Sequence, residues 1–172
     1  MIQEKTMRKE LTEIEIKQIK EEIRRRQAET TPKCIEEVQR TRALGDLSEN
    51  DEYRSAKREL NRNYSRIRYL KALLEGAVVI QDDSDEFTVG LFDRVTYFDE
   101  EQEEEVTITL VTPLRSDVLK GNVSKESPLG KALMGKKEGD RVSVRVNDNY
   151  SYFVKIIALE KGVDDESFGA IH

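Results

Sequence analysis

A cluster of acidic side chains lies in the run ALGDLSENDEY, residues 43–53, between two charged stretches with helical periodicity. Asp46, Glu49, Asp51 and Glu52 fall within seven positions, directly after a glycine at which the chain is expected to turn. Carboxylate oxygens are the ligands that Mg²⁺, Mn²⁺ and Ca²⁺ prefer. The run is therefore either a solvated loop or a place where negative charge meets a cation that this chain does not hold alone.

The pair Asp46 and Glu49 has the spacing at which two side chains can point the same way around a turn or a first helical turn. The same spacing also suits a helix cap, with Asp46 as N-cap and Glu49 three residues later. Two carboxylates are too few to hold Mg²⁺ strongly, because this ion demands nearly octahedral oxygen ligation. The pair could, however, complete the shell of a metal that is held elsewhere.

The composition limits which other catalytic or metal-binding sites the chain could form. The only cysteine, Cys34, has no internal disulfide partner, and the only histidine, His172, is the last residue. A histidine base and a His-rich or Cys-rich metal site are therefore not expected. The sequence has no apolar run of membrane-spanning length, and its first residues, MIQEKTMRKE, lack an apolar signal core. We expect a cytoplasmic protein that does not enter a membrane.

The acidic run is expected to be the tip of an antiparallel helical hairpin. One helix is predicted over about 10–44, kinked or loosened near Pro32, and a second over about 50–75, ending at Gly76. Each helix carries an apolar seam with heptad-like spacing, and Asn63 is the one polar interruption in the second seam. The first seam consists of Ile16, Ile19, Ile23, Arg26 and Thr30, resuming at Ile35, Val38 and Arg42; the second consists of Tyr53, Ala56, Leu60, Asn63, Ile67, Leu70 and Leu74.

The second half of the chain has a different character. Residues 1–75 carry a net charge of +3 and residues 76–172 a net charge of −9, which places a domain boundary near this point. Short β-branched runs and a helix start at Ser127-Pro128 predict a small α+β domain with a largely antiparallel sheet. The predicted domains are 1–76, 77–160 and a flexible tail, 161–172. The predicted strands are 77–80, 93–98, 106–111, 140–146 and 151–159.

Two segments resemble one known family. The pattern T-P-x-x-I-x-x-V…R-A-L-G-D-L-S-E-N-D-E-Y, residues 31–53, is similar to the hairpin tip of the bacterial Gre-type transcript cleavage factors. The segment VSKESPLGKALMGKKEGDRVSVRV, residues 123–146, resembles a second conserved segment of the same family. The resemblance extends over most of residues 10–160.

This resemblance implies a fold and a function. It implies an N-terminal antiparallel coiled coil followed by an FKBP-like α+β domain with an antiparallel sheet. It also implies a transcription elongation factor that enters the secondary channel of bacterial RNA polymerase and stimulates cleavage of backtracked RNA. By motif, Asp46 and Glu49 become the acids that help to position a Mg²⁺ shared with the polymerase. The protein would not itself be an enzyme, because the polymerase performs the cleavage.

Further contacts and alternatives follow from the same region. Arg54, Lys57 and Arg58 could meet phosphates of nascent RNA, or could simply be a solvated helix face. Ser48 and Asn50, beside the acids, are expected to contact RNA or polymerase. A monomer is expected. Asp51 is an additional acid at a position where the family commonly has a small residue. The alternative within the family is therefore a protein that binds the same channel but inhibits the polymerase. The alternative from another class is a coiled-coil adaptor for an unrelated protein.

Overall fold

The structure is a computed structural model that describes residues 9–45 and 50–165. The chain divides into two compact units, with the division between Val79 and Ile80. The domain boundary predicted at residue 76 lies three residues earlier. The difference arises because residues 77–79 pair with the start of the chain and so belong to the first unit.

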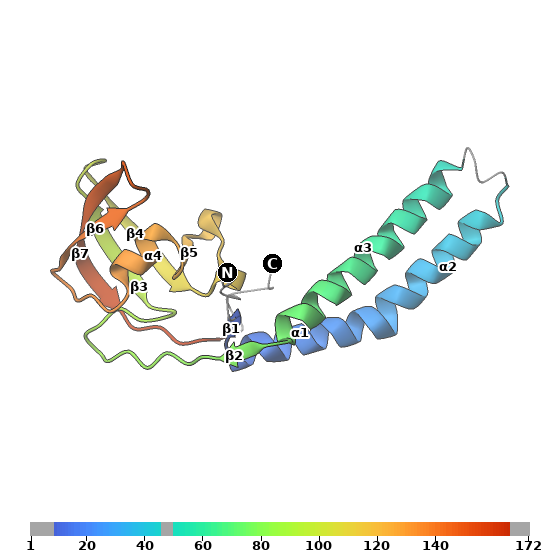
Figure 1. Ribbon diagram of the computed structural model, residues 1–172, viewed down its shortest axis with the longest axis horizontal. Helices are drawn as coiled ribbons and strands as arrows, with labels where there is room; N and C mark the ends of the chain where they lie inside the picture. The colour runs from blue at the N-terminus through green and yellow to red at the C-terminus, as the bar shows by residue number, and fades with distance from the viewer. Residues whose placement is uncertain (1–8, 46–49, 166–172) are drawn as a thin grey trace, which may run out of the picture. The chain divides into compact units, whose positions relative to one another are not determined.

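The first unit is the expected antiparallel helical hairpin (Figure 1). Its first arm runs through α1 (Glu13–Arg25), a π-helical segment η1 (Arg26–Thr30) and α2 (Thr31–Arg42). Its second arm is the single helix α3 (Asp51–Leu74). The buried side chains of α3 are Ala56, Asn63, Ile67, Leu70 and Leu73. The seam predicted for α3 is thus confirmed at these positions except at its end, where Leu73 is buried in place of Leu74, and its members Tyr53 and Leu60 are partly buried. The seam predicted for the first arm was wrong after Pro32, because Ile35 and Arg42 are exposed and Thr41 is the buried residue of α2.

The base of the hairpin contains a two-stranded parallel sheet that the sequence did not predict. Strand β1 (Lys9–Leu11) pairs with β2 (Ala77–Val79). The prediction that residues 77–80 join the sheet of the second half was wrong, because their partner is β1. The prediction of helix from residue 10 was also wrong: Thr12 is the N-cap of α1, and its side chain and that of Glu15 form a reciprocal capping box.

The first arm loosens directly before Pro32, as predicted. Proline has no backbone N–H and disfavours α-helical geometry in the residues before it. In the structure Thr31 donates both its backbone N–H and its Oγ1 hydroxyl to the carbonyl of Arg26, five residues earlier. The result is a turn that contains one residue more than an α-helical turn.

The second unit is built on a five-stranded sheet in the order β5-β4-β3-β7-β6. Its strands are β3 (Arg94–Asp99), β4 (Glu104–Val111), β5 (Asn122–Ser124), β6 (Arg141–Arg145) and β7 (Ser151–Glu160). All neighbours are antiparallel except β4 and β5, which are parallel. The predicted α+β class with a largely antiparallel sheet is therefore confirmed, although β5 was not predicted.

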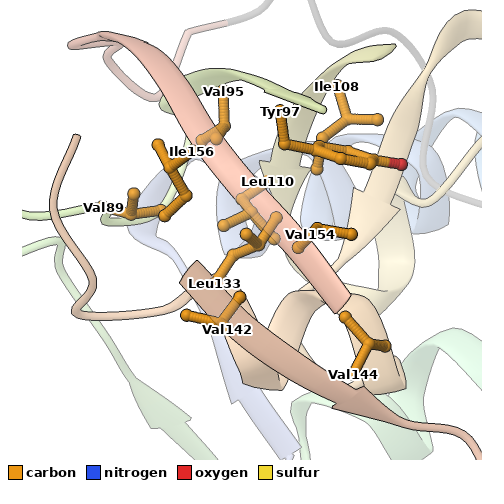
Figure 2. Close-up of a cluster of buried hydrophobic side chains, with 10 residues drawn as sticks. All are labelled: Val89, Val95, Tyr97, Ile108, Leu110, Leu133, Val142, Val144, Val154 and Ile156. Atoms are coloured by element: carbon orange, nitrogen blue, oxygen red, sulfur yellow. The ribbon is translucent and has the colours of Figure 1, made fainter. Parts of the chain in front are cut away.

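One face of this sheet packs on the short helix α4 (Pro128–Leu133). Figure 2 shows the core, in which Leu133 of α4 lies among inward-facing side chains of β3, β4, β6 and β7. Ser127 caps the helix through the N–H of Gly130, and Gly135, with φ of 72°, lies just past its end. The start and end predicted for this helix are confirmed.

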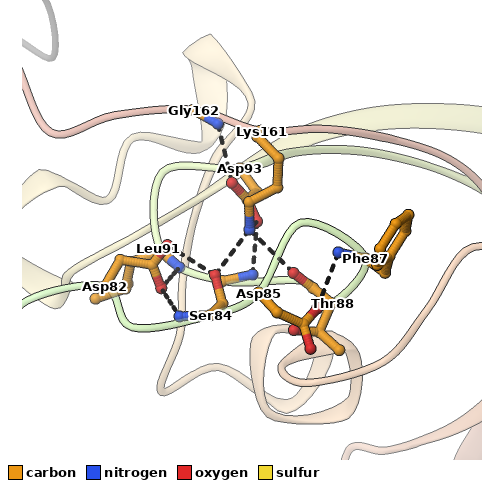
Figure 3. A network of polar contacts seen from close by, with 10 residues as sticks. Asp82, Ser84, Asp85, Phe87, Thr88, Leu91, Asp93, Lys161 and Gly162 are labelled. Atoms are coloured by element: carbon orange, nitrogen blue, oxygen red, sulfur yellow. Dashed lines mark hydrogen bonds and ion pairs between the residues drawn. The ribbon is translucent and has the colours of Figure 1, made fainter.

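An ion pair between Asp93 and the partly exposed Lys161 ties the segment before β3 to the segment after β7 (Figure 3). Asp93 is fully buried, and its carboxylate accepts from Lys161 Nζ at 2.6 Å and from the N–H groups of Gly90 and Gly162. Lys161 Nζ also donates to Ser84 Oγ and to the carbonyl of Thr88. Lys161 and Gly162, which the sequence assigned to a flexible tail, are thus hydrogen-bonded to the body of the unit.

Candidate functional site

The tip of the hairpin lies between the end of α2 and the start of α3. Three of the predicted site residues, Asp46, Ser48 and Glu49, lie outside the described residues. The two ends that flank them are described. On one side Ala43 is the C-cap of α2, and Gly45 lies two residues later with φ of 134°, a conformation that favours glycine. On the other side α3 begins at Asp51.

Asn50 joins the two arms directly beside the tip. Its side-chain oxygen accepts from the backbone N–H of Tyr53 at 2.9 Å, which makes it the N-cap of α3. Its side-chain nitrogen donates to the carbonyl of Thr41, on the other arm, at 2.8 Å. Asn50 therefore has a structural role at the end of the tip. The N-cap of α3 is therefore Asn50, and the alternative that makes Asp46 a helix cap with Glu49 three residues later lies outside the described residues.

Charged side chains also bridge the arms near the tip. Arg40 of α2 forms two hydrogen bonds with Glu37, and its Nη2 lies 3.6 Å from a carboxylate oxygen of Glu52 on α3. The hydrogen bonds from Arg40 lower the pKa of Glu37 below its ordinary value. All three side chains are solvent-exposed, so each pair adds little to stability. Together these three side chains form a surface of mixed charge next to the tip.

The basic triad of α3 consists of Arg54, Lys57 and Arg58, all exposed. Positions three and four residues apart share one side of a helix, so the triad forms a single positive surface on the side away from the buried seam. Arg54 Nη1 lies 3.8 Å from Asp51, and Lys57 Nζ lies 6.0 Å from the centre of the Tyr53 ring. Contacts of this kind contribute little at exposed positions.

Halfway along the hairpin, a polar layer interrupts the apolar seam. It consists of Glu22, Arg26, Thr31, Asn63 and Arg66. Burial pushes the pKa of Glu22 upward, but hydrogen bonds from Arg66 and Arg26, together with their charges, outweigh this and hold its pKa below the ordinary value. The layer therefore contains a carboxylate that remains ionised at neutral pH and pairs with an arginine from each arm.

Among the described residues, no three or more His, Cys, Asp or Glu side chains gather as the ligands of a metal would. The two acids predicted to meet a cation, Asp46 and Glu49, lie outside the described residues, and the neighbouring carboxylates of Asp51 and Glu52 are exposed. None of the described helices has the length and apolar character needed to cross a membrane.

Sequence reasoning missed two features of this unit. The inter-arm hydrogen bond from Asn50 to Thr41 has no sequence signal beyond the helical spacing that aligns Thr41 with Val38. The Glu22–Arg66 pair joins residues 44 positions apart, and its carboxylate and guanidinium are both partly buried. The polar residues within the two predicted seams, Asn63 in the second and Arg26 in the first, were the available indications of a polar layer.

Two family profiles match consecutive parts of the chain. Residues 9–79 match the profile described as "Transcription elongation factor, N-terminal", and residues 83–161 match "Transcription elongation factor, GreA/GreB, C-term". The two matches coincide closely with the two structural units.

Curated relatives agree with these matches. Transcription elongation factor GreA of Caldanaerobacter subterraneus subsp. tengcongensis is 40% identical over 134 residues, which cover 76% of this chain and 84% of that protein. GreA of Brucella canis is 40% identical over 146 residues, covering 83% and 90%. Among solved structures, GreA factor homolog 1 (Gfh1) of Thermus thermophilus is 25% identical, covering 88% of this chain and 98% of that one, with a TM-score of 0.40. The profiles and the sequence relatives establish that the chain belongs to the GreA/GreB family of transcription elongation factors.

Proposed function

We propose that this protein binds bacterial RNA polymerase during elongation and stimulates the polymerase to cleave backtracked RNA. The observation that carries the proposal is that both units match the family, each with its own profile. A shared helical hairpin alone would suit many proteins, but relatives that match most of the chain are named as transcription elongation factors. Nascent RNA within the elongation complex is the second partner in this proposal.

In this proposal the hairpin delivers acids to an active centre that belongs to the polymerase. Asp46 and Glu49 would hold a Mg²⁺ jointly with the polymerase, and the ion when bound would assist attack by water on the phosphodiester. The chain contributes carboxylates and a rigid support rather than a complete catalytic site, so it is a factor and not itself an enzyme. Asn50 supports this role by anchoring the start of α3 to the other arm.

The basic triad gives the proposal an electrostatic component. Its surface begins one turn from Asn50 and lies on the solvent side of α3. Arg54, Lys57 and Arg58 would contact phosphates of the displaced RNA, and such contacts weaken as salt rises. In this proposal Ser48, beside the acids of the tip, contacts RNA or polymerase. The protein acts as a monomer in the cytoplasm, where the polymerase is found.

One observation favours a second candidate function, inhibition of the polymerase. Asp51 is an additional acid in the first turn of α3, and its side chain is 93% exposed. A further carboxylate near the tip could hold the shared cation in an unproductive arrangement. The same experiment separates the two candidates, because an inhibitor would slow RNA extension without shortening the RNA.

The experiment uses a stalled, backtracked elongation complex with radiolabelled RNA. Adding the full chain should produce RNA shortened from its 3′ end, and the shortened RNA should extend again when nucleotides are supplied. The matched control is a chain with Asp46→Asn and Glu49→Gln, which preserves side-chain size and removes charge. RNA that remains full length with the wild-type chain would overturn the proposal.

A further inference from the structure

The spacing between successive inward-facing residues differs between the two arms of the hairpin at one point. On α3, the inward-facing residues Ala56, Leu60, Asn63, Ile67 and Leu70 follow a regular alternation of four and three. On the first arm the spacing from Arg26 to Thr31 is five, and it coincides with η1. The first arm continues from there through Cys34, Val38 and Thr41 at regular spacing. One extra residue is therefore inserted in one arm only.

Asn63 contacts both ends of this inserted turn. The Asn63 side chain is almost fully buried, at 2% exposure. Its Oδ1 accepts from Arg26 Nη1 at 3.1 Å, and its Nδ2 donates to Thr31 Oγ1 at 2.8 Å. Thr31 Oγ1 in turn donates to the carbonyl of Arg26, at 2.9 Å. The amide of Asn63 is thus hydrogen-bonded to both ends of the five-residue step.

The surroundings of the polar layer penalise any other alignment of the arms. On α3 the next buried residue is Ile67, and on the first arm the buried residue before the layer is Ile23. A slip by one helical turn would place the Asn63 amide against apolar side chains, where a buried amide loses its hydrogen bonds. A single buried asparagine in a coiled-coil seam fixes register in this way.

Register determines where the tip lies. From Asn63 to Asn50 is thirteen residues, or about 20 Å of helix, and a slip of one turn moves one arm about 5 Å past the other. The hydrogen bond from Asn50 Nδ2 to the carbonyl of Thr41, on the other arm, would then be broken as well. We propose that Asn63 and Thr31 are positioning residues that fix the register of the arms and thereby the geometry of the tip acids. The effect of this register on RNA cleavage rests on the proposed function, whereas the register itself does not.

The test compares Asn63→Leu with Asn63→Asp. Leucine fills the seam but removes the hydrogen bonds, whereas aspartate keeps the shape and the acceptor for Arg26 and loses only the donor to Thr31 Oγ1. Spin labels on Glu36→Cys and Lys71→Cys, exposed positions on opposite arms that are well separated along the hairpin axis, report the register by pulsed electron resonance in a Cys34→Ser background. Asn63→Leu should add a distance population displaced by several ångströms, since most of a slip of about 5 Å then lies along the line between the labels. Asn63→Asp should retain the single wild-type population.

Cleavage by the polymerase provides the second readout. With Asn63→Leu the maximal rate should fall about tenfold or more, because misplacement of a positioned group by a few ångströms is costly. The concentration for half-maximal effect should stay within about twofold, since the docking surfaces are intact. Asn63→Asp should restore most of the rate. Arg62→Ala, an exposed change one residue away, should have no effect on either measurement.

A single, undisplaced distance population in Asn63→Leu would overturn the proposal, as would equal losses of rate in Asn63→Leu and Asn63→Asp. If Asn63→Leu does not fold, Thr31→Val takes its place, because it removes the hydroxyl and preserves the shape. Absence of stimulated cleavage with the wild-type chain would refute the proposed function alone. The distance measurement needs no polymerase, so it would still decide the question of register.

Discussion

Replacing Asn50 by alanine removes two interactions at the point where the tip joins α3. The first is the helix cap, in which Oδ1 accepts from the N–H of Tyr53. Loss of such a cap typically costs about 1 kcal/mol. The second is the bond from Nδ2 to the Thr41 carbonyl, which links the arms. A hydrogen bond of this kind contributes about 1 kcal/mol net, so the two losses together are about 2 kcal/mol.

This loss should be visible in thermal unfolding of the full chain followed by helical circular dichroism. For a unit of this size each kcal/mol shifts the melting temperature by about 4–8 °C, so Asn50→Ala should melt about 8–16 °C lower than wild type. Asn50→Asp retains the cap acceptor and loses only the donor to Thr41, and should fall about half as far. Ser55→Ala, at an exposed position on the same helix, should change little.

Two outcomes would refute this reasoning. A melting temperature for Asn50→Ala within about 2 °C of wild type would mean that neither interaction contributes to stability. A drop for Asn50→Asp as large as that for Asn50→Ala would mean that the cap contributes nothing and that the link to Thr41 accounts for the entire effect.

Four other expectations concern the tip and the polar layer. Asp46→Ala or Glu49→Ala should abolish stimulated cleavage with polymerase binding nearly unchanged; a matched loss of binding would indicate a structural role instead. Calorimetry should find Mg²⁺ binding to the isolated chain in the millimolar range or weaker, and micromolar binding lost in Asp46→Ala would contradict a shared site. Reversing the charge of the basic triad should reduce cleavage of long backtracked RNA more than of short RNA at low salt, whereas a uniform, salt-insensitive loss would exclude RNA contact. Glu22→Gln should lower the melting temperature at pH 7. Because folding lowers the pKa of Glu22 below 4.5, its contribution is complete above that value and is lost as the pH falls through the lowered pKa, so wild type and variant should converge in acid.

The helical hairpin could be predicted because its signal is local. The spacing of apolar residues follows from helix geometry. A proline disrupts the preceding turn of any helix that contains it, as Pro32 does here. Strand β1 had no such signal. It is three residues long, and it exists because β2, far along the chain, pairs with it. The capping box of Thr12 and Glu15 was a usable sign that the helix begins after residue 11.

The tip was harder to predict because several residues compete for one position. Asp46, Ser48 and Asn50 are all good N-cap residues, and sequence alone does not rank them. The choice of Asn50 depends on its second hydrogen bond, to a carbonyl of the opposite arm. Similarly, the five-residue step at η1 depends on the hydrogen bonds that join Thr31 to Arg26 and to Asn63, which have no local sequence signal.

The parallel pair of β1 and β2 closes the base of the hairpin, so the two arms are joined at both ends. The Lys9 side chain reinforces the closure through the carbonyl of Ala72. A chain cut at the tip would therefore yield two pieces that share a strand pair, a seam and a polar layer. The tip is therefore a position at which the chain could be divided into two separately expressed halves, which could be labelled individually and then recombined.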